Sequence, residues 1–86
     1  MTAIQDLVGT LMSVKLSAGQ LSGMITSTSE SLNEQNFKIM ALSQGSCSGE
    51  QAVQEMGLAV RSLIDAASAL RSLEGDCGKF VQEIGK

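Results

Sequence analysis

The sequence has no proline, tryptophan, tyrosine or histidine, and Phe37 and Phe80 are its only aromatic residues. The absence of histidine removes the commonest general base and the commonest metal ligand of proteins. The absence of proline means that nothing of that kind interrupts a long helix. We therefore predict that the chain is not an enzyme and that it has no catalytic, metal or cofactor site.

Charged residues are few and scattered. Six Lys and Arg stand against nine Asp and Glu, a net charge of −3 over 86 residues. Because no basic face exists to follow a phosphate backbone, we do not expect a nucleic-acid partner. A pair of amphipathic helices on a membrane surface is disfavoured as well, since the polar faces lack the Lys and Arg that anionic lipids attract.

Long apolar runs are also missing. No stretch approaches the roughly 20 apolar residues that are needed to cross a bilayer. No basic start followed by an apolar run and a small-residue cleavage site is visible. We expect either a cytoplasmic protein or one secreted by a route that reads no cleavable signal peptide.

What the chain does have is an apolar repeat with steps that alternate between three and four residues, the spacing of one helix face. In the first half the repeat comprises Ile4, Leu7, Leu11, Val14, Ala18, Leu21, Ile25, Thr28, Leu32, Gln35, Ile39 and Leu42. In the second half it comprises Ala52, Met56, Ala59, Leu63, Ala66, Leu70, Leu73, Cys77, Phe80 and Ile84. The repeat predicts a helix over residues 3–43, a turn over 44–49 and a second helix over 50–84.

The two repeats match each other if the chain turns back between Leu42 and Ala52. The numbers of facing residues then sum to 94 or 95 in every layer, as for Leu32 opposite Leu63. We therefore predict an all-α fold, an antiparallel two-helix hairpin that forms a single domain over residues 1–86.

Glycines weaken both predicted helices. Gly9, Gly19 and Gly23 each cost about 1 kcal/mol relative to alanine inside a helix. A break between Ser17 and Ser27 is one possibility, but the apolar repeat passes through that region without a skip and favours a continuous or kinked helix. Gly75 and Gly78 weaken the second helix after Glu74, where we expect it to fray.

The turn region is rich in glycine and serine. Gly45 is well placed for the left-handed conformation that ends a helix. Ser48 and Gln51 fit a capping box, which predicts that the second helix starts at Gly49 or Glu50.

The two cysteines are predicted to lie far apart. Cys47 falls in the turn and Cys77 far down the second helix, roughly 45 Å away at about 1.5 Å per residue. Since bridged Cα atoms lie within about 7 Å, a disulfide within one hairpin is excluded. We read Cys77 as a small core residue and Cys47 as a loop thiol; a disulfide between molecules through Cys47 is the alternative.

Further apolar residues fall outside the predicted contact between the helices. A stripe this wide is typical of a helix packed against two neighbours, so we predict a four-helix bundle formed with a homo- or heterodimeric partner hairpin. The predicted partner interface comprises Val53, Val60, Ile64, Val81, Met24, Phe37 and Met40. Alternatively, these are ordinary exposed apolar side chains.

The turn carries Cys47, Ser48 and Gly49, followed by Ala52 and Met56. Together with the two long helices, this stretch resembles the Trp-x-Gly family of small type VII secretion proteins, with Cys47 in place of the tryptophan. The resemblance implies homo- or heterodimerisation and export from a Gram-positive bacterium, as a secreted substrate or a targeting partner.

One departure concerns the export signal of that family, Tyr-x-x-x-Asp or Glu after the second helix. This chain has no tyrosine; Ile84 stands four residues after Phe80, and Glu83 is one place too early. The resemblance then implies that a partner carries the signal, either a larger exported toxin or a second hairpin. The alternative function is a cytosolic structural or adaptor hairpin that forms a homodimer and has no export role.

Overall fold

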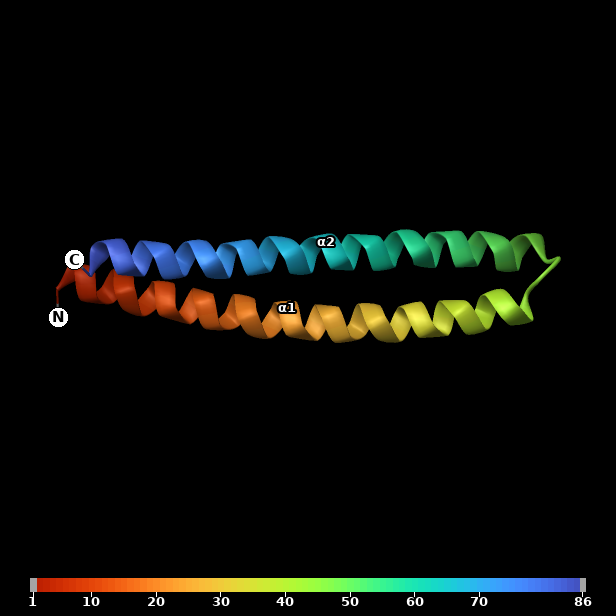
Figure 1. Ribbon diagram of the computed structural model, residues 1–86, viewed down its shortest axis with the longest axis horizontal. Coiled ribbons are helices and arrows are strands. Elements are labelled where there is room, and N and C mark those ends of the chain that lie inside the picture. Colours follow the sequence, from red (N-terminus) through yellow and green to blue (C-terminus); the bar gives the residue numbers. More distant parts are fainter. Residues whose placement is uncertain (1, 86) are drawn as a thin grey trace.

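Two helices make up the computed structural model, which describes residues 2–85: α1 (Ala3–Leu42) and α2 (Cys47–Ile84). They run antiparallel and side by side along their whole length, with the start of α1 and the end of α2 at one end of a rod and the turn at the other (Figure 1). The Cα atoms span 64 × 15 × 13 Å. The predicted all-α antiparallel hairpin is confirmed. Within residues 2–85, neither helix contains a stretch both long and apolar enough to span a bilayer.

Helix α1 is continuous. Thr2 caps it: its hydroxyl accepts from the Gln5 backbone N–H at 3.1 Å, and the Gln5 side chain accepts from the Thr2 N–H at 3.1 Å. The possible break between Ser17 and Ser27 does not occur. Helix α2 is also unbroken as far as Ile84, so the fraying expected after Glu74 is not seen.

The turn is shorter than predicted. The Ser43 backbone N–H donates to the Ile39 carbonyl at 2.9 Å and closes α1, and Gly45 has a φ of +85°, the left-handed conformation expected of it. Ser46 is extended and its hydroxyl accepts from the Gly49 N–H at 3.2 Å. The prediction that Ser48 caps α2 was therefore wrong. Because the chain reverses immediately after Gly45, Ser46 reaches the capping position first.

The contact between the helices, which we call the seam, uses only half of the predicted repeat. Ten of its buried or half-buried residues belong to that repeat, and we call them the shared positions: Leu11, Ala18, Ile25, Leu32, Ile39, Met56, Leu63, Leu70, Cys77 and Ile84. The other ten, the inner flank, each lie one residue after a predicted position: Val8, Lys15, Ser22, Ser29, Asn36, Val53, Val60, Ala67, Glu74 and Val81. Alternate layers of the predicted pairing are thus displaced by one residue, and Leu21 and Leu73 remain 46% and 43% exposed.

Small side chains explain the displacement. Ala18 and Ala67 are only 4% and 2% exposed, and Ser22 and Ser29 are also buried. Both serine hydroxyls donate to carbonyls of their own helix, so their burial leaves no donor unpaired. Helices approach more closely where the contacting side chains are small. The seam therefore turns toward serine and alanine and away from leucine.

One polar side chain joins the helices within this seam. Asn36 is buried and its Nδ2 donates to the Val53 carbonyl at 3.4 Å, while its Oδ1 is buried without a hydrogen-bond partner. The sequence pattern puts a polar layer at Gln35, but Gln35 is exposed. The polar layer lies one residue later, as the displacement of the seam requires.

Substitution of two neighbouring alanines tests the seam. Ala67→Leu adds a bulky side chain where no space exists and should destabilise the hairpin by about 1–3 kcal/mol. The melting temperature, followed by circular dichroism, should then fall by about 4–8 °C for each kcal/mol. Ala66→Leu is the matched control, because Ala66 is exposed. Equal melting temperatures, or a lower one for Ala66→Leu, would contradict this seam.

Candidate partner-binding face

The residues displaced from the seam lie together on one side of the hairpin. Both helices are right-handed and run in opposite directions, so an equal angular offset from the seam points to the same side on each. We call this side the open face. It comprises Leu7, Val14, Leu21, Thr28, Gln35, Leu42, Ala52, Ala59, Ala66, Leu73 and Phe80, all of them exposed.

The open face is uncharged and uneven in size. None of its eleven residues is acidic or basic. Leucine, valine and phenylalanine dominate toward the chain ends, at positions such as Leu21, Leu73 and Phe80. Alanine, threonine and glutamine fill most of the half nearer the turn. An exposed, uncharged face with several large apolar residues is a candidate site of protein association.

Charged residues border the open face. Three residues beyond its positions in α2 stand Glu55, Asp76 and Glu83, and Lys38 has the same relation to Gln35 in α1. Because residues three apart are neighbours on a helix surface, these charges lie along the two edges. An apolar centre with a polar edge is the usual composition of a protein–protein interface.

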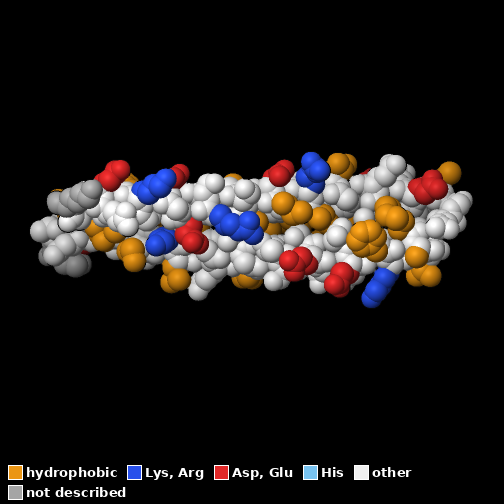
Figure 2. All heavy atoms as spheres, in the orientation of Figure 1, with side chains coloured by type: hydrophobic (Ala, Val, Ile, Leu, Met, Phe, Trp, Pro, Cys, Tyr) orange, Lys and Arg blue, Asp and Glu red, His pale blue; other side chains and the backbone are white. Residues whose placement is uncertain are grey.

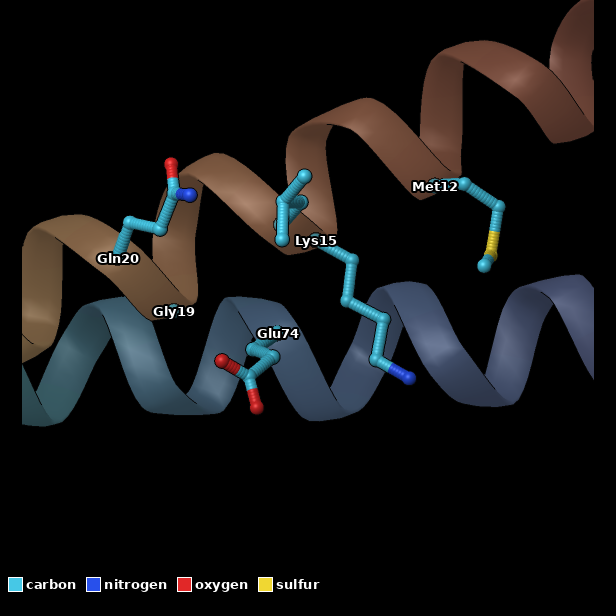
Figure 3. A pocket seen from close by; sticks show the side chains of 6 residues that line it. Met12, Lys15, Gly19, Gln20 and Glu74 are labelled. Atoms are coloured by element: carbon cyan, nitrogen blue, oxygen red, sulfur yellow. The ribbon is translucent and has the colours of Figure 1, made fainter.

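Another surface of the rod carries charge among its apolar side chains. On the face that Figure 2 shows, Lys, Arg, Asp and Glu are scattered along the whole length, with hydrophobic side chains exposed between them. A groove of about 480 Å³ is lined by Met12, Lys15, Leu16, Gly19, Gln20 and Glu74. In Figure 3 Lys15 reaches across from α1 toward α2, and Gln20 points away from α2.

This groove is shaped by the close approach of the helices. The Glu74 carboxylate lies directly against Gly19, where a Cβ would force that flexible side chain to move. Within residues 2–85, no three His, Cys, Asp or Glu side chains gather closely enough to hold a metal ion. The groove is shallow and open to solvent.

The structure divides the predicted partner interface. Val60 lies in the seam and is only 8% exposed, so the hairpin does not present it as a surface, and its assignment to a partner interface is corrected. The physical reason is the one-residue displacement of the seam. Val53 and Val81 also lie in the seam but are half-buried, and Val53 lines a groove beside the turn, so their role in partner binding stays a prediction.

The other four predicted interface residues, Ile64, Met24, Phe37 and Met40, are exposed but do not form one patch. Ile64 lines a groove with Val60, Met40 lines a groove beside the turn, and Met24 lines another groove with Thr28. A role for these four in partner binding stays a prediction.

The apolar repeat did not predict the open face as a surface, because it assigned these residues to the contact between the two helices. The signal that reveals it is the seven-residue spacing of Ser22, Ser29 and Asn36. Three small polar residues at one helical position indicate a close contact if their hydrogen bonds are satisfied locally. Hydrophobicity alone assigns such residues to the solvent side.

The turn motif lies inside α2 rather than before it. Cys47, Ser48 and Gly49 form the first turn of the helix, and Cys47 is exposed. A Cβ on Gly49 would collide with the side chain of Ser43, so this glycine lets the two helices meet at the turn. The Gly49 of the motif therefore has a packing role.

No family model, no curated protein and no solved structure matches this chain. The Trp-x-Gly resemblance accordingly depends on the turn residues and the hairpin architecture. The open face is the feature from which a function can be argued.

The two free thiols should differ in reactivity. Cys47 is exposed, whereas Cys77 is a shared position of the seam and 6% exposed. In maleimide labelling followed by mass spectrometry, we expect Cys47 to react at the rate of a free thiol and Cys77 at least about tenfold more slowly, because Cys77 reacts only after opening of the structure. The Cys47→Ser variant should keep only the slow site. Two equally fast sites would contradict the burial of Cys77.

Proposed function

We propose that this chain is a protein-docking hairpin of the type VII secretion type, which acts as a secreted substrate or as a targeting partner. In this proposal the open face packs against a second hairpin and forms a four-helix bundle. The observation that carries the proposal is the continuous, uncharged open face along both helices.

The dimensions of the rod suit such a partner. A face about as long and wide as the 64 × 15 Å rod is comparable to the roughly 800 Å² that each partner contributes to a standard interface. A second hairpin has the length to cover this face from end to end. A globular protein would cover only part of it.

The size distribution favours one orientation of the partner. Large residues such as Leu21 and Leu73 lie toward the chain ends, and small residues such as Thr28 and Ala66 lie toward the turn. If the partner has a similar face, antiparallel stacking places the large layers of each hairpin on the small layers of the other. Parallel stacking would place large on large and leave gaps between the small layers.

The export part of the proposal is supported by the resemblance of the turn. Gly49 packs against Ser43, and it is followed by Ala52 and Met56, as an alanine and then a larger apolar residue follow the glycine in the Trp-x-Gly family. Since the chain has no tyrosine for the export signal, we propose that its partner supplies that signal. The chain would then leave the cell by the type VII route, bound to that partner.

Two aspartate substitutions distinguish the open face from the rest of the rod. Leu73→Asp places a charge in the proposed interface and should weaken association at least about tenfold, or 1.4 kcal/mol. Ile64→Asp is the control: Ile64 is also exposed, but lies next to the inner flank on the other side of the seam. Sedimentation would give the mass, alone and with products of neighbouring genes. Val60→Asp cannot serve here, because a charge buried in the seam should unfold the hairpin.

Circular dichroism must show both variants to be as helical as the unmodified chain. Association lost in Ile64→Asp but kept in Leu73→Asp would move the interface to the other side of the seam and contradict the proposal.

Secretion itself is testable in a Gram-positive host with a type VII system. The tagged chain should appear in the medium only when a signal-bearing partner and the membrane ATPase of the system are present. Leu73→Asp should remain in the cells because it cannot bind that partner. A chain that binds its partner yet stays in the cytoplasm would favour the adaptor function over export.

A further inference from the structure

The shared positions of the seam have two flanks that compete for burial. On one side lies the inner flank, now in the contact; on the other lies the open face. Each open-face residue at positions 7, 14, 21, 28 and 35 of α1 directly precedes an inner-flank residue, and the same holds for positions 52, 59, 66, 73 and 80 of α2. Either flank, combined with the shared positions, therefore forms a regular stripe along each helix that can make the contact between the helices.

In α1, the inner-flank residues that lie beside the shared positions are mostly polar. Lys15, Ser22, Ser29 and Asn36 occupy four of its five positions there, and the Asn36 Oδ1 is buried without a partner. At the equivalent positions the open face offers Leu7, Val14 and Leu21 toward the chain ends, and Thr28 and Gln35 toward the turn. Small residues allow the close packing of the present seam. The open face would bury more apolar surface in a wider seam toward the chain ends, where Leu73 and Phe80 replace Glu74 and Val81, but less toward the turn, where Ala52 and Ala59 replace Val53 and Val60.

We propose that α1 and α2 rotate in opposite senses by about 50° about their own axes and so exchange the two flanks. Successive residues of a helix are separated by about 100°, and moving the seam from one flank to the other requires about half of that angle. The shared positions stay buried throughout. In the rotated hairpin the open face is covered by the chain itself, and the inner flank meets water, including the polar Ser22, Ser29 and Asn36 of α1 and the apolar Val53, Val60 and Val81 of α2.

Few directional contacts oppose this rotation. Among residues 2–85, two side-chain hydrogen bonds join the helices: Asn36 Nδ2 to the Val53 carbonyl, and Arg71 to the Thr26 hydroxyl at 2.9 Å. Both cysteines are free, so no covalent bond fixes the helices to each other. The turn is short, exposed at Gln44 to Ser46, and contains the flexible Gly45.

The rotation would act as a switch on docking. An unpartnered chain withdraws its open face from solvent, and a partner that binds the open face holds the helices in the present packing. The regulatory consequence depends on the proposed function, but the rotation itself does not. It is a property of the single hairpin.

Thiol protection in a dilute, monomeric chain tests the rotation, with Cys77 as the internal reference. Cys77 is a shared position and stays buried in both packings, whereas Ala67 belongs to the inner flank and is buried only in the present one. All variants carry Cys47→Ser. One keeps Cys77 as its single thiol, and another carries Ala67→Cys together with Cys77→Ala, so that position 67 holds its single thiol. Ser29→Cys provides a nearly isosteric second probe on α1. Maleimide labelling is measured under conditions that keep the chain folded.

Rotation predicts that Ala67→Cys and Ser29→Cys react at least about tenfold faster than Cys77. Global unfolding would expose all three thiols equally, and fraying of the helix end would expose Cys77 first, since it lies nearer the end of α2. Equal rates, or the fastest rate at Cys77, would overturn the rotation. If addition of a partner slows the labelling of Ala67→Cys to the rate of Cys77, rotation and docking are linked. If no partner binds, the labelling rates of the monomer still test the rotation.

Discussion

The close approach of two helices through small side chains determines the rest of this structure. Ala18, Ser22, Ser29 and Ala67 are buried where the helices meet, and the serine hydroxyls are satisfied by their own helix. In the packing described here, this contact sets the rotation of each helix about its axis. Once that rotation is set, half of the apolar repeat lies in the seam and the other half is left on one side of the rod. The surface available to a partner is thus a consequence of how the hairpin packs internally.

Much of the fold could be predicted because it depends on helical periodicity. The two helices, their antiparallel pairing and the left-handed Gly45 follow from the apolar repeat and the glycine-rich turn. The rotation of the seam could not be predicted from hydrophobicity, which treats serine as a residue that faces water. A serine whose hydroxyl bonds to its own helix behaves as a small side chain instead, and Ser22 and Ser29 do so. The same limit explains why Val60 was assigned to a partner and Leu73 to the core.

The cap of α2 shows a second limit. Ser46 and Ser48 are both suitable capping residues, and only the path of the chain after Gly45 decides between them. The proposed function also depends on more than the sequence pattern. The open face supports docking to another hairpin, and the turn resemblance supports a role in type VII secretion. In this proposal the rod acts through what binds along its length. If its helices also rotate, the same residues that bind a partner form the core of the chain when it is alone.

Small-angle X-ray scattering of the purified chain, alone and with the products of neighbouring genes, tests the central claim most directly, because it reports mass and shape together. The account predicts that the chain forms a particle of greater mass than 9.0 kDa with a thicker cross-section and a length still close to 64 Å, as expected if a second hairpin covers the open face side by side. A mass of 9.0 kDa and a single thin rod under every condition, or an assembly that grows in length rather than thickness, would contradict it.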